Sequence, residues 1–368
     1  MRRGLAIGVV LLGLGVVVGV WDPGRIASRA SLLLRSVVAA RPLPPKSLSP
    51  QAVEHQVDEA IVDIRVVPVG AGSPVVFGTG MILTANGIVL TNNHLVFHAR
   101  TVTIWLSGHS RAVSARIIGV DPAADVAVLQ IPGAQALPTV TGASGAPMPG
   151  TRVIALGNAG GLGGTPKATT GKILGTGATI VATGPAGPET LYGMIETTAP
   201  LAPGDSGGPL INRWGLVLGM DTASLNPSDA ASGFTGPSFA VPIKTVLAIA
   251  ERVERHAATP SIYLRPPVNM GIEVCSLAYW AAHYGPVPAF VMHGAAVETV
   301  DGQGPARNSG IVPGDFITTF NGRTVTGPGE LSRLEKDYRP GDRVTVSWVN
   351  AAGESLTADV VLGSSPWP

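Results

Sequence analysis

Cysteine and charge are both scarce in this chain. Cys275 is the one cysteine among 368 residues, which excludes disulfide bonds within the chain and a zinc site built from several thiolates. It lies in the apolar run 271–280, so we expect a small buried hydrophobic residue. Charged residues make up 13% of the sequence, the formal net charge is +1, and no region concentrates lysine and arginine. Nucleic acid is therefore not expected as a partner, and no motif indicates a cofactor or a metal ion.

Glycine and proline, by contrast, are plentiful, with 48 and 32 residues. From residue 75 onward, short apolar runs rich in β-branched residues alternate with glycine, asparagine, aspartate and proline. This pattern is typical of short strands joined by tight turns and predicts a mainly β structure. A periodic apolar face over 243–256 predicts a helix that ends the β region. The runs that predict strands are 75–83, 87–93, 101–106, 115–120, 125–131, 152–157, 171–181, 215–222 and 238–243.

An uncharged apolar run stands near the N-terminus. Gly4–Trp21 follows Arg2 and Arg3, and its 18 residues are just enough for a helix to span a bilayer. No small-residue cleavage site follows directly, and the better candidate at 38–40 lies far downstream. We therefore interpret residues 1–21 as an uncleaved, single-pass anchor with its arginines in the cytoplasm, which leaves the rest of the chain outside it. Cleavage and secretion is the alternative.

The remaining chain divides into three parts. Residues 22–50 form a proline-rich, extended linker. A β-rich unit is expected over 51–257, and it opens with a short helix that leads into a strand. A second unit, 258–368, has strands and a helix predicted at 328–338. The stretch 276–294 is unusually aromatic for this chain, and its pattern indicates no particular role.

The segment LAPGDSGGPL, residues 201–210, concentrates backbone freedom around the single hydroxyl of Ser206. A serine hydroxyl is a weak nucleophile: it needs a histidine base, a carboxylate that orients the base, and backbone N–H groups aimed at the developing oxyanion. Glycine allows two N–H groups to converge on one point. We expect Gly204 and Ser206 to donate them, with Gly207 and Gly208 leaving room for substrate. Taken alone, the motif is equally compatible with a surface turn.

Seven histidines are available as a base. His94 directly follows an apolar run with strand character, so a rigid element can position it. His98 and His109 lie in more polar, less constrained stretches, and His55 precedes the β region. A histidine at the end of a strand is often structural, so the assignment depends on its partners.

Two aspartates are candidates for the orienting acid. Asp121 precedes a proline and is typical of a turn. Asp125 opens an apolar run, where a carboxylate is partly buried and needs a partner. Asp125 is therefore the better candidate.

Three motifs now stand in the order histidine, aspartate, serine: TNNHLV (91–96), DVAVLQI (125–131) and GDSGGPL (204–210). Together they resemble the chymotrypsin-fold serine proteases, in particular the bacterial HtrA-like branch. The resemblance implies a double six-stranded β-barrel, with His94 as general base, Asp125 as orienting acid and Ser206 as nucleophile. It covers about residues 75–250 and is also carried by the segments 78–94, 155–177 and 239–243.

Two features depart from that family. Many HtrA-like enzymes have asparagine before the serine, whereas this chain has Asp205, as trypsin-like enzymes do. In trypsin this aspartate pairs with a new N-terminal amine, but no matching activation sequence is present here, so the partner of Asp205 is open. The stretch between Val69 and Thr79 is short, and the long regulatory loop that some HtrA enzymes insert there is missing.

The resemblance also places a specificity pocket. No aspartate stands six residues before Ser206, so a trypsin-like preference for lysine or arginine before the cut is not expected. Small or aliphatic residues are expected instead. The residues expected to line one wall are Pro200, Leu201, Ala202 and Pro203, and those expected on the edge strand that pairs with substrate are Thr222, Ala223 and Ser224.

The second unit resembles a PDZ domain, a small β-barrel or sandwich with helices. The segment NSGIVPGDFITTFNGRTV, residues 308–325, carries the resemblance. It implies that the loop NMGI, formed by Asn269, Met270, Gly271 and Ile272, binds the C-terminal carboxylate of a peptide through backbone N–H groups. A strand that merely leads into the domain, with no ligand, is the alternative.

The sequence thus predicts a membrane-anchored serine endopeptidase that cleaves proteins outside the bacterial cytoplasm, in quality control or processing. Its expected partners are protein or peptide substrates, C-terminal peptides at the PDZ domain, and the membrane. Trimers are common in the resembling family, and the sequence leaves the oligomeric state open. The alternative function is a binding protein or chaperone in which the protease fold is inactive.

Overall fold

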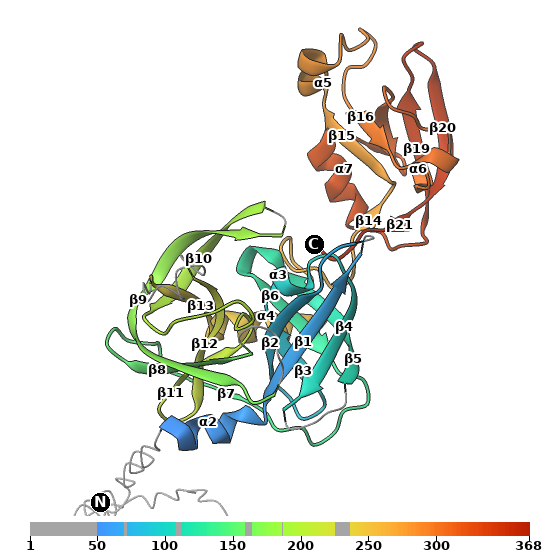
Figure 1. Cartoon of the computed structure of the whole chain (residues 1–368). Helices are drawn as coiled ribbons and strands as arrows, with labels where there is room; N and C mark the ends of the chain where they lie inside the picture. The colour runs from blue at the N-terminus through green and yellow to red at the C-terminus, as the bar shows by residue number, and fades with distance from the viewer. Residues whose placement is uncertain (1–49, 70–71, 108–111, 159–163, 186, 225–235) are drawn as a thin grey trace, which may run out of the picture. The chain divides into compact units, whose positions relative to one another are not determined.

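The computed structural model describes residues 50–69, 72–107, 112–158, 164–185, 187–224 and 236–368 (Figure 1). The expected anchor, Gly4–Trp21, lies outside these residues. Within the described ranges, none of the helices combines the length and the apolar character needed to cross a membrane.

The first part of the fold is a closed six-stranded barrel. Its strand order is β1-β2-β3-β6-β5-β4, and β1 pairs with both β2 and β4 to close it. β-branched and aliphatic side chains alternate along the strands and fill the interior, as in Val62, Ile64 and Ile104, each at most 1% exposed. The elements are α2 (Pro50–Asp58), β1 (Ile61–Pro68), β2 (Val76–Ile82), β3 (Ile88–Thr91), α3 (Asn93–Val96), β4 (Ala99–Leu106), β5 (Ala112–Asp121), the 3-10 helix η1 (Pro122–Ala124) and β6 (Val126–Gln130).

A second barrel follows. Six of its strands form a ring, because β11 pairs with β8 on one side and β12 on the other, while β7 adds to β12 in parallel. The predicted closing helix is confirmed as α4 (Ile243–Glu254), which packs apolar residues such as Val246 and Val253 against the core. The strands are β7 (Thr141–Gly142), β8 (Arg152–Gly157), β9 (Lys167–Gly184), β10 (Gly187–Thr197), β11 (Pro209–Asn212), β12 (Leu216–Ser224) and β13 (Ser238–Pro242).

The hairpin β9–β10 is the longest in the chain's described part, because β9 alone has 18 residues. Ile180 and Leu191 are partners across the hairpin, and both are buried in the main core cluster. The residues that directly follow them, Val181 and Tyr192, are by contrast 63% and 70% exposed. The pairing register shifts between Leu191 and Met194, where Gly193 takes φ +72°. These irregularities bend the hairpin, since a bulge increases local twist.

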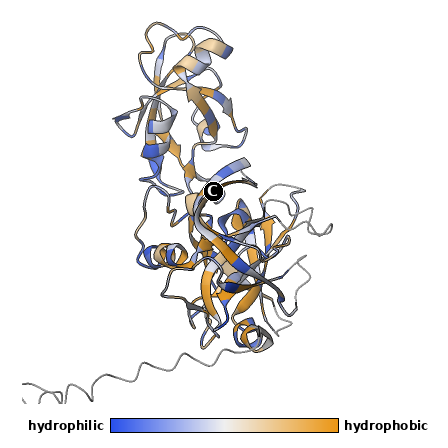
Figure 2. Cartoon of the chain, turned by 90° about the vertical axis from the view of Figure 1, so that its left-hand side faces the viewer, coloured by the Kyte–Doolittle hydropathy of each residue, from blue (hydrophilic) through white to orange (hydrophobic). Residues whose placement is uncertain are grey.

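The C-terminal part has its own core and a sheet in the order β15-β16-β17-β19-β20. β15 is therefore an edge strand, and α7 contacts both β15 and β16. Figure 2 shows apolar residues concentrated along the strands. The elements are β14 (Val268–Asn269), β15 (Ile272–Ser276), α5 (Leu277–His283), β16 (Ala295–Val300), α6 (Pro305–Asn308), β17 (Phe316–Phe320), β18 (Arg323–Thr324), α7 (Pro328–Glu335), β19 (Arg343–Val349), β20 (Ser355–Val361) and β21 (Gly363–Ser364).

The aromatic stretch 276–294 contains α5, which the sequence did not predict. Ser276 caps it by accepting a hydrogen bond from the Tyr279 N–H at 3.1 Å. Trp280 stacks on Tyr284 and packs edge-on against Phe316 of β17. Cys275, just before the cap, is buried as expected. The stretch thus begins with a short helix that contacts β15 and β16 of this sheet.

Candidate active site

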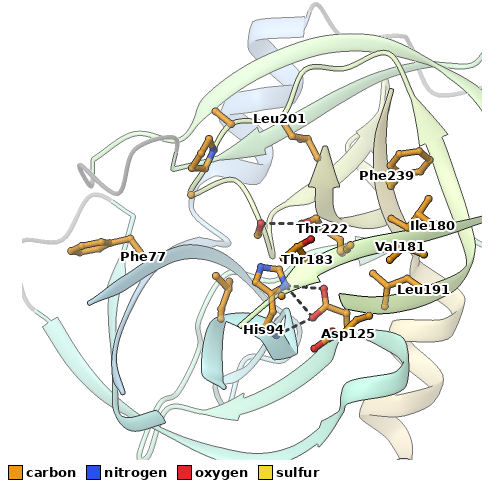
Figure 3. A pocket seen from close by; sticks show the side chains of 18 residues that line it. Phe77, His94, Asp125, Ile180, Val181, Thr183, Leu191, Leu201, Thr222 and Phe239 are labelled. Atoms are coloured by element: carbon orange, nitrogen blue, oxygen red, sulfur yellow. Dashed lines mark hydrogen bonds and ion pairs between the residues drawn. The ribbon is translucent and has the colours of Figure 1, made fainter. Parts of the chain in front are cut away.

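His94 lies in α3, directly after β3 ends. β3 is buried along its whole length, so it fixes where α3 begins. Nδ1 of His94 lies 2.9 Å from Oδ2 and 3.1 Å from Oδ1 of Asp125, and the His94 main-chain N–H donates to Oδ1 at 2.9 Å (Figure 3). These contacts orient the imidazole and leave Nε2 available for a second partner.

Asp125 follows η1 in the left-handed conformation, with φ 53°, which aspartate adopts more readily than most residues. Its side chain is 2% exposed, as expected for a carboxylate that opens a buried strand. Asn92 supports the same corner, because its Nδ2 donates to the Asp125 carbonyl at 3.0 Å and to Thr222 Oγ1 at 2.8 Å. The other candidate acid, Asp121, instead accepts a hydrogen bond from Ser261.

The charge environment of His94 favours its protonated form. Burial alone lowers the pKa of His94, but the charge of Asp125, the hydrogen bond to it and the charge of Glu189 outweigh burial, so the pKa of His94 is raised. An imidazolium formed at this position is therefore stabilised, which is what a base that takes a proton during a reaction requires.

Ser206 lies in a sharply turned loop. Gly204 and Gly207 on either side of it have φ +104° and +88°, values that favour glycine. The Ser206 hydroxyl donates to the Thr222 carbonyl at 3.1 Å. Among the hydrogen bonds of the described residues, neither the Gly204 N–H nor the Ser206 N–H has an acceptor. Both donors are thus free to bind an oxyanion.

The glycines after Ser206 serve a different purpose from the one expected. A Cβ on Gly207 would lie 2.0 Å from the Thr79 carbonyl oxygen, and one on Gly208 would lie 2.1 Å from the Leu156 carbonyl oxygen. The expectation that these glycines leave room for substrate is therefore wrong. They allow the loop to pack directly against neighbouring backbone.

Thr79 of β2 holds the Ser206 loop from the first barrel. Its N–H donates to the Ser206 carbonyl at 2.9 Å, and its Oγ1 donates to the Gly204 carbonyl at 2.7 Å. The same Oγ1 accepts from the Asn158 N–H at 2.8 Å. Thr79 therefore fixes the carbonyls at both positions whose N–H groups remain free.

A cleft of about 600 Å³ opens beside Ser206. Three of the residues expected to line one wall, Leu201, Ala202 and Pro203, do so, as does Thr222. Pro200 is not among the lining residues, and its carbonyl accepts from Thr169 Oγ1 at 2.7 Å. Ala223 and Ser224 continue β12 and pair with Phe239 and Ser238. The remaining lining residues are Phe77, His94, Leu95, Asp125, Ile180, Val181, Ala182, Thr183, Gly184, Glu189, Leu191, Gly204, Ser206 and Phe239.

The NMGI loop lies at the start of the edge strand β15. Gly271 has φ +71°, and a Cβ there would lie 2.7 Å from the Gly304 Cα, so only glycine fits. Met270 is 1% exposed and belongs to the core. Asn269 is partly buried and donates to Ser365 Oγ at 2.9 Å. Ile272 begins β15 and pairs with Val300.

Comparisons with known proteins agree with these two units. A family model of the trypsin-like peptidase domain matches residues 78–220, and one of the PDZ domain matches residues 268–362. Serine protease PepD of Mycobacterium tuberculosis is 27% identical over 89% of this chain and 69% of its own length. A probable periplasmic serine endoprotease DegP-like of Ectopseudomonas mendocina is 29% identical over 93% of this chain and 68% of its own. The chain is an HtrA-like serine protease with a C-terminal PDZ domain.

A further relative and a solved structure differ in how much of their own length this chain covers. The DegP-like protein of Brucella suis is 31% identical, and the match covers 79% of this chain but 53% of that protein. Among solved structures, the HtrA-type protease AlgW with tripeptide has 26% sequence identity and a TM-score of 0.49, covering 87% of this chain and 99% of that one. This HtrA-like chain is thus a serine endopeptidase by its peptidase domain and its named relatives.

In this HtrA-like protease, Asp205 interacts electrostatically with groups of both signs: the charge of Lys167 lowers the pKa of Asp205, and the charge of Asp205 raises the pKa of Asp221. Oδ2 of Asp205 accepts from the Ala202 N–H at 2.8 Å, while Oδ1 is buried without a hydrogen bond in the described residues. Asp221 is 0% exposed, and neither of its carboxyl oxygens has a hydrogen-bond partner there. Burial raises the pKa of Asp221 well above its ordinary value, and the charge of Asp205 raises it further. Burial and the charge of Asp205 thus both favour the neutral form of Asp221.

Sequence reasoning missed several residues of the site. The site also includes Thr79, Asn92 and Glu189. None of the three is singled out by a local sequence motif that indicates a function. Asn92 stands within the quoted TNNH segment, and a polar residue between a buried strand and a histidine was the available signal. Thr79 and Glu189 become visible only when segments distant in sequence meet.

Proposed function

We propose that this protease hydrolyses peptide bonds with Ser206 as nucleophile, His94 as general base and Asp125 as the acid that orients the base. The observation that carries the proposal is the pair of hydrogen bonds from His94 to Asp125, one from Nδ1 at 2.9 Å and one from the main-chain N–H at 2.9 Å. They fix the tautomer in which Nε2 can accept a proton.

In this mechanism the Ser206 hydroxyl rotates from the Thr222 carbonyl toward Nε2 of His94. Apo structures often show such catalytic hydrogen bonds unformed. Oγ then attacks the scissile carbonyl carbon while its proton passes to Nε2. The carbonyl oxygen becomes negative and accepts from the N–H groups of Gly204 and Ser206.

The tetrahedral intermediate collapses when the scissile C–N bond breaks. His94 gives its proton to the departing amine, which leaves the acyl group on Ser206 Oγ. Water then attacks the ester carbonyl while His94 takes a proton from that water. The acyl C–Oγ bond of the second tetrahedral intermediate breaks, His94 returns its proton to Oγ, and the carboxylic acid and the Ser206 hydroxyl are released. Asp125 keeps the imidazole oriented and stabilises the imidazolium each time it forms.

We propose that the residue before the cut is small or aliphatic. Its pocket is bordered by Leu201, Ala202, Pro203 and Phe239, and none of these four bears a charge. A lysine or arginine placed against this wall loses hydration without gaining a counterion, which is costly. Mass spectrometry of cleavage products gives the preference directly.

We propose that the PDZ domain binds the C-terminus of a peptide at the NMGI loop. The edge strand β15 can accept an extended peptide as an added strand, and the loop before it supplies backbone N–H groups for a carboxylate. The turn at Gly271 and the position of α7 beside β15 support this. Calorimetry with free-acid and amidated forms of one hydrophobic peptide tests it, because equal affinities contradict a carboxylate site.

We also propose that the enzyme acts outside the cytoplasm. Relatives from Ectopseudomonas and Brucella are named as periplasmic proteases, and the apolar run Gly4–Trp21 has the length of a membrane anchor. Full-length protein is then expected to stay in the membrane fraction after a carbonate wash. Release into the wash, with a new N-terminus near residue 41, contradicts anchoring.

A fluorophosphonate probe together with casein cleavage tests the catalytic assignment. Ser206→Ala is expected to abolish labelling and to lower turnover by about six orders of magnitude, as serine knockouts do in comparable triads. His94→Ala is expected to be about as damaging. Casein cleavage by Ser206→Ala within tenfold of the wild type contradicts the assignment, and an unlabelled wild type supports the alternative of an inactive binding protein.

A further inference from the structure

The hairpin β9–β10 forms one wall of the cleft. Residues 180–184 of β9, together with Glu189 and Leu191 of β10, line it. In Figure 3 Thr183 lies close to His94, and Leu191 lies on the Asp125 side of the cleft with Ile180 and Val181 above it. Ile180 and Leu191 are 8% and 2% exposed and pack in the main core. The wall is thus anchored to the core and keeps its place beside His94.

Glu189 is the unusual residue in this wall. Apart from Asp125, it is the one carboxylate that lines the cleft, and the described lining residues include neither lysine nor arginine. Within the described part of the chain, Glu189 has neither an ion pair nor a side-chain hydrogen bond. Its partner across the hairpin is Ala182, which has no polar side chain.

Glu189 is also close to the catalytic groups. Burial and the charge of Asp125 raise the pKa of Glu189, while His94 lowers it. A Cβ on Gly184 would lie 3.1 Å from Oε1 of Glu189, so the glycine leaves the carboxylate uncovered on that side. Glu189 therefore presents a negative charge that nothing in the described protein neutralises fully.

The position of an extended substrate determines which residue meets this charge. Successive side chains of an extended chain point to opposite sides. If the residue before the cut enters the pocket bordered by Leu201 and Pro203, the side chain one position earlier points to the opposite side, toward His94 and the hairpin. In Figure 3 Leu201 and His94 lie on opposite sides of the cleft.

We propose that Glu189 selects a lysine or arginine at the position one residue before the residue whose carbonyl is attacked. The inference rests on the proposed function, since it assumes attack by Ser206. The substrate class that follows is an extended segment with a basic residue directly before a small or aliphatic one. A long basic side chain lays its apolar stem along the hairpin and brings its charge to the carboxylate.

The test compares fluorogenic peptides that differ only at this position, with lysine, glutamine or glutamate. In the wild type we expect kcat/KM to be about fivefold higher for lysine than for glutamine, the scale of a partly exposed ion pair. In Glu189→Gln this ratio is expected to fall to about one. Glu196→Gln, on the same strand but outside the cleft, is the matched control and is expected to keep the ratio.

Two further measurements separate this inference from the proposed function. The lysine peptide titrated against Ser206→Ala protein is expected to bind more tightly than the glutamine peptide, and Glu189→Gln on that background is expected to remove the difference. Raising the salt concentration is expected to reduce the preference, because screening weakens partly exposed charge pairs. Normal fluorophosphonate labelling without any lysine preference overturns the role of Glu189 alone. A wild type that is not labelled overturns the proposed function and this inference together.

Discussion

The main-chain N–H of Thr79 donates to the carbonyl of Ser206 at 2.9 Å, and thereby joins the first barrel to the Ser206 loop of the second. The hydroxyl of the same threonine donates to the Gly204 carbonyl at 2.7 Å. The peptide units that follow Gly204 and Ser206 thus take their orientation from a residue far away in sequence. The direction of the proposed oxyanion donors depends on that orientation.

Thr79→Val tests this relationship with little change in shape. The variant keeps the main-chain bond to Ser206 but loses the hydrogen bond from Thr79 Oγ1 to the Gly204 carbonyl and the one that Oγ1 accepts from the Asn158 N–H. An unsatisfied buried polar group costs about 1–3 kcal/mol, so we expect kcat/KM to fall about tenfold to a hundredfold. Thr101→Val, at an exposed position of β4, is the control. An unchanged kcat/KM in Thr79→Val contradicts the positioning role.

Gly207→Ala is expected to reduce fluorophosphonate labelling far more than the left-handed conformation of Gly207 alone would explain. Its φ is +88°, and the new Cβ would lie 2.0 Å from the Thr79 carbonyl oxygen. Gly150→Ala separates the two effects, since Gly150 has φ +82° but no heavy atom lies within 4 Å of the place that a Cβ would take. We expect Gly150→Ala to cost about 1 kcal/mol in unfolding free energy and to keep fluorophosphonate labelling. Labelling of Gly207→Ala at the wild-type rate contradicts the close packing.

The pH dependence of kcat/KM is expected to report His94. Only neutral His94 can accept the proton of Ser206, so activity rises with pH through the pKa of His94, which lies above its ordinary value of 6.5. The charge of Glu189 contributes to that increase. In Glu189→Gln, measured with an uncharged peptide, the acidic limb is therefore expected to move to lower pH. A limb that stays in place, or moves to higher pH, contradicts the electrostatic contact between Glu189 and His94.

The buried carboxyl of Asp221 is expected to change how the free energy of unfolding depends on pH. Its pKa is raised in the folded protein, so the folded state binds more protons than the unfolded state at pH values above the ordinary pKa of 3.8. The contribution of Asp221 to the free energy of unfolding therefore declines as pH rises from about that value toward its folded pKa. Asp221→Asn removes this decline. We expect the variant to gain stability relative to the wild type as pH increases, and chemical denaturation at several pH values measures it. A stability difference between the two proteins that stays constant with pH contradicts a raised pKa of Asp221 in the folded protein.

Local patterns predicted much of the fold and the three central residues of the site. The alternation of apolar and turn residues predicted most of the barrel strands, although no predicted run covers β7, β10 or β11. The period of 243–256 predicted α4. His94, Asp125 and Ser206 stand in motifs whose chemistry can be inferred from residue type, and the structure brings His94 and Asp125 into hydrogen-bond contact. The catalytic roles themselves remain a prediction until Ser206→Ala is measured.

The contacts between distant segments could not be predicted in this way. The sequence near Thr79 shows only that a strand is present, because its partners at Gly204 and Ser206 depend on how two barrels meet. Gly207 was assigned to substrate access for the same reason. In the sequence, Glu189 stands in a polar stretch that is typical of turns. Only the pairing register of β9 and β10 places it at the cleft. The helix α5 was missed because its aromatic residues pack on a sheet that local periodicity does not reveal.

The hydrogen bonds that tie Asn92 to Thr222, and Thr79 to the Ser206 loop, have a consequence for how the enzyme is made. The ribosome delivers His94 and Asp125 early and β12 much later. Until β12 has emerged and paired, Ser206 has neither the Thr222 carbonyl nor its place against the first barrel. In a chain still being synthesised, the proposed nucleophile therefore lacks the contacts that hold its loop, and cleavage by the proposed triad requires both barrels to be complete.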